Sequence, residues 1–398
     1  MRMTWRGAAA SMLVVGASVA RAQAPPESRG WQVDPSLYAL GSLDNSTDLP
    51  FGISFRGRDR EPLAAPNLGL GLDVSRQAER GWFKGSLFGL ARSPFSDFDR
   101  TLFGAGWVEA SQRFGDTGRL TFSDEGKAQT RPHVDVSDYW YNVATLRAEW
   151  HRSGGHGFEV EVDDRRRGLP DLPFLGFAQQ SLGGGVFIPW GAEGRARLGG
   201  EVQHYSAPTA EGGRAVAEAE IARFAPKGIA TVRLAWFEPF GDRRLTPPSG
   251  AGTDEGYEFG DVGRSEFFEM LTFHAAHIPM LEGSFFFDPF ESESDQWDFG
   301  RRKLVVAAFA SRRLGSRTTA SAFVRYQHKN GPNLLLPADA PGAASFVDDR
   351  AEARAALSYK IRPRLSLLFQ GWYVQSWSER QPLDFRRFMV AAGVQFHF

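Results

Sequence analysis

The chain ends in Phe388-Met-Val390-Ala-Ala392-Gly-Val394-Gln-Phe396-His-Phe398, a stretch in which every second residue is apolar or small. Successive side chains of a β-strand point to opposite faces, so the row from Phe388 to Phe398 forms one apolar surface. Arg387, Gln395 and His397 lie between these residues and share the opposite surface. The pattern predicts a strand with one face toward an apolar medium and the other toward water.

This ending resembles the C-terminal strand of Gram-negative outer-membrane β-barrel proteins, in which the last residue is characteristically Phe and is read during insertion. The resemblance covers only the last strand and places the insertion signal at Val394, Phe396 and Phe398. It implies that the barrel-assembly machinery is a partner and that outer-membrane lipid and lipopolysaccharide surround the protein. A soluble sandwich that ends on an amphipathic strand is the alternative.

The N-terminus has the features of a secretory signal peptide. Arg2 and Arg6 precede a short apolar run at positions 7–19, and Ala20-Arg-Ala22 places small residues where a signal peptidase cuts. The run is too short to cross a bilayer as a helix, which takes about 20 residues. We therefore expect cleavage after Ala22, export through the inner membrane and residence in the cell outer membrane.

The composition is compatible with an exported barrel. The 398 residues include 44 Gly and 33 Phe but no Cys, and the formal charge is −1. Removal of Arg2, Arg6 and Arg21 with the signal peptide changes this charge to −4. Such a balanced chain is not expected to bind nucleic acid.

The spacing of the predicted strands gives the strongest architectural signal. About eighteen runs alternate with period two, and their connections alternate between short turns and mostly long loops, the plan of an outer-membrane barrel with short periplasmic turns. The eight short turns are Gln77–Gly81, Gly115–Gly118, Arg152–His156, Pro189–Gly194, Ala225–Gly228, Ile278–Leu281, Arg313–Ser316 and Ile361–Arg364.

These runs predict an all-β fold, a transmembrane antiparallel up-and-down β-barrel. Both termini are expected at the periplasmic end, so the strand number must be even, and sixteen satisfies this as well as eighteen. The predicted organisation is a signal peptide over residues 1–22, a short periplasmic tail over 23–35 and the barrel over 36–398. A barrel of this size encloses more space than its side chains fill, so we expect an aqueous lumen.

Alternation also assigns the polar rows to the lumen. In the run Asn142–Trp150, Ala144, Leu146 and Ala148 alternate with Arg147 and Glu149. A charged side chain at the lipid midplane costs about 2–4 kcal/mol, which favours the inner position for the polar row. The predicted pore-lining residues are Arg147, Glu149, Glu159, Glu161, Arg195, Arg197, Glu201, Glu218, Glu220, Arg233, Arg325, Glu352 and Arg354.

Three consecutive arginines, Arg165, Arg166 and Arg167, follow Asp163 and Asp164 where the seventh run meets an outer loop. Adjacent guanidinium groups bind phosphates by charge-assisted hydrogen bonds, so this run is a candidate anion or lipopolysaccharide contact. Pairing with the neighbouring acids is the alternative.

The mixed-charge lining predicts an outer-membrane channel for passive, porin-like diffusion of small hydrophilic solutes. The alternatives are the barrel component of a polysaccharide or polymer export system, and a structural or surface-interaction barrel whose lumen is blocked. None of the eight histidines stands in a His-Glu-x-x-His motif, and Gly-x-Ser-x-Gly is absent, so no catalytic residue is expected. We likewise expect no cofactor and no metal site. The oligomeric state is left open.

Overall fold

The structure is a computed structural model. It describes residues 30–44, 63–92, 101–130, 139–152, 154–168, 177–191, 193–207, 210–225, 228–245, 302–331, 346–378 and 385–398. Within these ranges no helix has the length and apolar character needed to cross a membrane.

The described residues form sixteen strands joined by turns. The strands are β1 (Trp31–Asp44), β2 (Leu63–Gln77), β3 (Gly81–Arg92), β4 (Thr101–Phe114), β5 (Gly118–Thr130), β6 (Tyr139–His151), β7 (Gly157–Gly168), β8 (Phe177–Trp190), β9 (Gly194–Ala207), β10 (Ala210–Ala225), β11 (Gly228–Leu245), β12 (Arg302–Leu314), β13 (Thr318–Gly331), β14 (Phe346–Arg362), β15 (Leu365–Ser378) and β16 (Phe385–His397).

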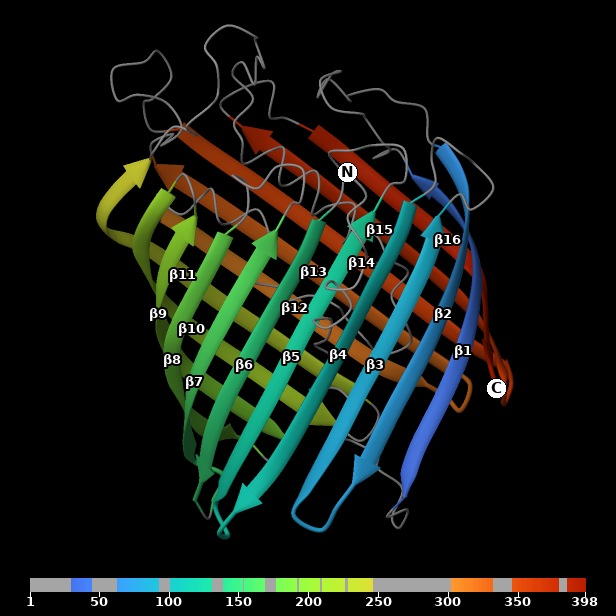
Figure 1. The fold of residues 1–398 in the computed structure, drawn as a ribbon, viewed down its shortest axis with the longest axis horizontal. Coiled ribbons are helices and arrows are strands. Elements are labelled where there is room, and N and C mark those ends of the chain that lie inside the picture. Colours follow the sequence, from blue (N-terminus) through green and yellow to red (C-terminus); the bar gives the residue numbers. More distant parts are fainter. Residues whose placement is uncertain are drawn as a thin grey trace, which may run out of the picture.

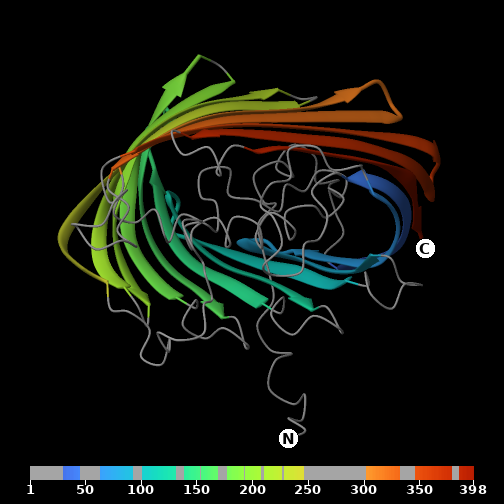
Figure 2. The same cartoon turned by 90° about the horizontal axis from the view of Figure 1, so that it is seen from above.

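The strands close into a single antiparallel barrel. Each strand pairs with the next one along the chain, and β1 also pairs with β16. The strands run steeply across the molecule (Figure 1), and the view from above shows an elongated rather than circular ring (Figure 2). Because a closed sheet has no free edge, every strand finds its backbone partners within the barrel.

Short turns gather at one end of the barrel, the end that also holds the start of β1 and the end of β16 (Figure 1). Seven of the eight predicted short turns fall between consecutive strands of the structure, and the eighth, Ile278–Leu281, lies outside the described residues. Gly115 and Gly315 have φ values of 59° and 85° in two of these turns, a conformation that side chains with a Cβ rarely adopt.

The strand number is sixteen, the smaller of the two values that parity allowed. β11 pairs directly with β12, so the barrel closes without the extra hairpin that the sequence suggested around residues 278–281. β1 begins at Trp31, five residues before the expected start of the barrel at residue 36.

The outer surface of the barrel is apolar, as contact with lipid requires. Leu70, Leu182 and Val232 are each more than half exposed there, although a soluble protein would bury such side chains. Aromatic rings mark the short-turn end, where Trp150 stacks on Phe158 at 4.7 Å between ring centres. This arrangement matches the aromatic girdle of membrane-spanning barrels.

The seam between the two chain ends is joined by backbone and side-chain bonds. The backbone N–H of Phe398 donates to the carbonyl oxygen of Pro35 at 3.1 Å. On the inner side, Gln395 Nε2 donates to the Tyr38 hydroxyl at 2.7 Å. On the outer side, Phe398 and Phe396 meet edge to face at 5.2 Å. The predicted faces of the last strand are therefore the observed ones.

Candidate functional site: the inner wall of the barrel

The first part of the inner wall is a group of charged side chains on β6 and β7. Arg147 bonds to Glu161 on the neighbouring strand, and its Nε lies 3.7 Å from Glu159 Oε2. Asp163, on the same face of β7, accepts hydrogen bonds from the hydroxyl groups of Thr145 at 2.6 Å and Ser181 at 3.0 Å. The alternation of β6 and β7 thus places acids and an arginine together on the lumen side.

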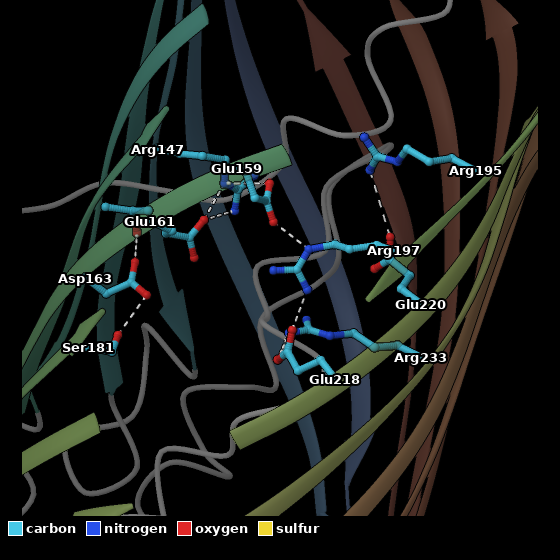
Figure 3. Close-up of polar contacts among 11 residues, drawn as sticks. Arg147, Glu159, Glu161, Asp163, Ser181, Arg195, Arg197, Glu218, Glu220 and Arg233 are labelled. Carbon is cyan, nitrogen blue, oxygen red and sulfur yellow. Dashed lines mark hydrogen bonds and ion pairs between the residues drawn. The ribbon is translucent and has the colours of Figure 1, made fainter. Parts of the chain in front are cut away.

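Arg197 extends this group across three further strands (Figure 3). Its Nε lies 2.5 Å from Glu159 Oε1 on β7, and its Nη1 lies 2.6 Å from Glu218 Oε2 on β10. Glu218 in turn bonds to Arg233 on β11. We call the five residues Arg147, Glu159, Arg197, Glu218 and Arg233 the charge ladder. It links β6 to β11 through alternating opposite charges on the inner face.

Gly185 on β8 and Gly199 on β9 let Arg197 pass over β8, the strand that separates it from Glu159. In the register of the sheet, Gly185 lies opposite Glu159 of β7 on one side and opposite Gly199 of β9 on the other. A Cβ at Gly185 would lie 3.1 Å from Arg197 Nε, and one at Gly199 would lie 3.1 Å from Arg197 Nη1. The guanidinium group therefore rests on bare backbone, and side chains at these positions would lift it away from Glu159.

We expect Gly185→Leu to break the Arg197–Glu159 contact and to lower the free energy of unfolding by about 2–3 kcal/mol, since it crowds the site and separates a buried ion pair. The measurement is urea unfolding of the purified barrel in lipid vesicles. Gly41→Leu, on the outer face of β1, is the control for a leucine that meets no neighbour, because a Cβ at Gly41 has nothing within 4 Å. Equal unfolding midpoints for the two variants would rule out this role of Gly185.

A second, smaller charged group lies on β13 and β14. Glu352 accepts from Arg325 Nη2 at 2.7 Å and from Arg354 Nε at 2.5 Å. All three side chains are almost fully buried, and the Arg354 guanidinium lies 5.7 Å from the centre of the Phe323 ring. Because the Glu352 carboxylate pairs with both arginines, these ion pairs hold all three side chains in place.

The remaining predicted lining residues also lie on the inner face. Arg195 Nη2 is 3.9 Å from Glu220 Oε1, a looser pair than those of the charge ladder. Glu149 Oε2 lies 3.5 Å from His151 Nε2, and Glu201 accepts a hydrogen bond from Gln203. Six of the thirteen predicted residues therefore meet on β6–β11, namely the charge ladder and Glu161. Three more meet on β13–β14. The other four, Glu149, Arg195, Glu201 and Glu220, lie outside these two groups.

Part of the inner wall is apolar, and the predicted pore-lining residues did not include it. Val216, Ala235, Phe237, Val305, Ala307 and Phe323 form one buried cluster on β10–β13. Two cations lie over the Phe237 ring, Lys303 at 3.9 Å and Arg214 at 4.7 Å from its centre. The sequence carried a signal: in β11, Ala235 and Phe237 alternate with Leu234 and Trp236, so the strand is apolar on both faces.

The three arginines of the predicted anion contact belong to the last residues of β7. Strand alternation places Arg165 on the inner face beside Asp163 and Arg166 on the outer face. There Arg166 Nε lies 2.8 Å from Asp164 Oδ2. The side chain of Arg167 is outside the described parts. Consecutive arginines of this run therefore point to opposite faces, and the anion or lipopolysaccharide contact stays a prediction.

Comparisons with known proteins bear on the fold alone. No protein-family model and no curated protein sequence matches the chain. The backbone is similar to a bacterial polysaccharide outer membrane secretin (TM-score 0.38, 9% identity, 92% of this chain and 98% of that one). It is also similar to OprD of Pseudomonas aeruginosa (TM-score 0.43, 10% identity, 92% and 95%) and OccAB3 of Acinetobacter baumannii (TM-score 0.41, 10% identity, 92% and 99%).

Proposed function

We propose that this barrel of the outer-membrane type is a channel through which small hydrophilic solutes diffuse passively. The observation that carries the proposal is the charge ladder, which runs over the inner face from β6 to β11. An inner wall that holds both carboxylates and guanidinium groups offers counter-charges and hydrogen bonds to polar solutes of either sign.

The size of the barrel supports the same proposal. Eight-stranded barrels have interiors just wide enough for their own side chains, whereas barrels of sixteen strands leave an aqueous channel. The sixteen strands found here belong to the second class. The apolar cluster on β10–β13 separates the charge ladder from the charged group on β13 and β14, so solutes are expected to follow the longer of the two, the charge ladder.

Single-channel recording in a planar lipid bilayer tests the proposal. The purified full chain is expected to give steady, ohmic conductance steps in salt solution without any partner protein. A barrel that works only with an export complex, or a scaffold with a blocked lumen, gives no steps under these conditions. Absence of conductance from protein that is folded, as judged by its heat-modifiable mobility on gels, would therefore overturn the proposal.

Charge selectivity gives a second, residue-specific test. Arg147 is 43% exposed and stands among three acids, Glu149, Glu159 and Glu161. The Arg147→Gln substitution is expected to raise the permeability ratio of K⁺ over Cl⁻ by about twofold. It removes the positive charge, so the three acids give that part of the wall a larger net negative charge. Arg223→Gln is the control, because Arg223 lies on the outer face near a short turn. Equal reversal potentials for the two variants would contradict the assignment.

A further inference from the structure

A cluster of polar side chains interrupts the apolar outer surface on β5–β8. Asn142 Nδ2 donates to Asp124 Oδ1 at 2.6 Å, and Gln180 Nε2 donates to Asp164 Oδ1 at 3.1 Å. Arg166 Nε also donates to Asp164, at 2.8 Å. These five residues belong to the rows that alternate with the charge ladder, so they face away from the lumen. We call them the outer polar patch.

The patch lies unusually close to the short-turn end of the barrel. Asp124 comes six residues after β5 begins at Gly118, and Asp164 comes seven residues after β7 begins at Gly157. With a strand rise of about 3.3 Å and a tilt of about 40°, each residue adds roughly 2.5 Å of height. The two carboxylates therefore stand roughly 15–18 Å above the ends of their strands, inside an apolar band that is about 25 Å tall in such barrels.

On the opposite wall, the outward row of β14 has no charged group at this depth. On β14 the outward row runs from Ile361 to Ala351 without a charged residue, and the first acid is Asp349, thirteen residues from the end of the strand at Arg362. By the same arithmetic Asp349 stands roughly 33 Å high. The outer apolar surface is thus much shorter on β5–β8 than on β14, although one membrane surrounds both.

We propose that the outer polar patch on β5–β8 is the interface with a second copy of this chain. Membrane insertion gives both copies the same orientation and the same depth, so a two-fold axis along the membrane normal brings the patch against itself. The acceptors Asp124 and Asp164 of one copy then face the donors Asn142, Arg166 and Gln180 of the other.

The shape of the patch fits this occupant better than it fits lipid. Ala144 lies opposite Asp124 on one side and Asp164 on the other, so a small side chain separates two carboxylates that are about 10 Å apart, twice the strand spacing. The resulting notch accepts an arginine from the other copy. Acyl chains offer no hydrogen bonds to the patch, and lipopolysaccharide phosphates carry the same sign of charge as its two acids.

Single-cysteine cross-linking tests the proposal, because the natural chain contains no Cys. Val162→Cys places a thiol beside the patch, five residues from the start of β7. Val324→Cys places one on β13, six residues from the start of that strand. Val162 and Val324 are about equally exposed, at 48% and 52%. In outer-membrane vesicles a short bismaleimide is expected to yield at least about tenfold more covalent dimer from Val162→Cys than from Val324→Cys.

A notch-filling variant and a lipid probe complete the test. Adding Ala144→Trp to Val162→Cys is expected to abolish the dimer while the monomeric barrel still folds, since a tryptophan on the outer surface is tolerated by lipid. Equal cross-linking at the two positions would overturn the proposal. So would equal quenching of fluorophores on the two cysteines by spin-labelled phospholipid, which would mean that lipid covers the patch. Because cross-linking needs an inserted barrel but no open channel, its failure is separate from a failure of conductance.

Discussion

Deletion of Phe398 is expected to reduce the amount of this protein in the outer membrane by about tenfold. Two properties of the residue combine. Its backbone N–H bonds to Pro35 at the seam, and its ring extends the apolar outer row with Phe396. In the resemblance to outer-membrane barrels, the terminal aromatic is also the residue read during insertion. Phe398→Asp should have a similar effect, since it places a charge on the lipid-facing row.

The measurement is the fraction of total chain recovered in the outer membrane, by quantitative immunoblot. Phe398→Tyr is the control and should accumulate like the unchanged protein, because it keeps both the ring and the backbone bond. Refolding of the purified deletion variant into lipid vesicles separates the two roles. Normal refolding with poor accumulation supports an insertion signal, and unchanged accumulation in cells would refute both.

Replacement of Glu218 by Leu should lower the free energy of unfolding by about 3 kcal/mol, the second large effect. Glu218 is the one carboxylate that Arg197 and Arg233 share, and its side chain is only 8% exposed. Its removal leaves two guanidinium groups half-paired in a confined wall. Breaking a buried pair by removing one partner costs about 3–5 kcal/mol, and the partial exposure of the two arginines places this case at the lower end.

Glu220→Leu is the matched control, with the same substitution on the same face of β10. Glu220 is 22% exposed, and its pair with Arg195 spans 3.9 Å, so the expected loss is below about 1 kcal/mol. The two variants are compared by urea unfolding in vesicles, with the slope of the transition unchanged. A difference of less than about 1 kcal/mol between them would show that the charge ladder does not act as a unit.

The fold was predictable because lipid and water sort the two faces of each strand. In β6, the alternation of Arg147 and Glu149 with Leu146 and Ala148 fixed the faces without any knowledge of neighbours. The position of the short turns at one end of the barrel showed that the number of strands is even. The strand number did not follow from the sequence in the same way. The residues around 278–281 have the same hairpin pattern as the other short turns, so the sequence allowed eighteen strands. The direct pairing of β11 with β12 shows that sixteen strands close the barrel.

The contacts of the inner wall were not predictable from alternation. Arg197 and Glu159 stand on strands that are not adjacent, so their meeting depends on the register of β8 between them and on Gly185 in its middle. Likewise, Arg165 and Arg166 looked like one cluster because they are neighbours in the chain. A sequence gives the face of each residue along one strand, but the stagger between strands decides which charges meet.

The pairing of β1 with β16 also has a consequence for biogenesis. Tyr38 and Gln395, which bond across the seam, are 357 positions apart in the chain. The pairing of β1 with β16 is thus far more non-local than the pairing of consecutive strands, and such long-range contacts form slowly. Until then β1 exposes an unpaired edge, the kind of edge that captures other chains. Keeping β1 from pairing with other chains until it meets β16 is therefore a requirement built into the topology.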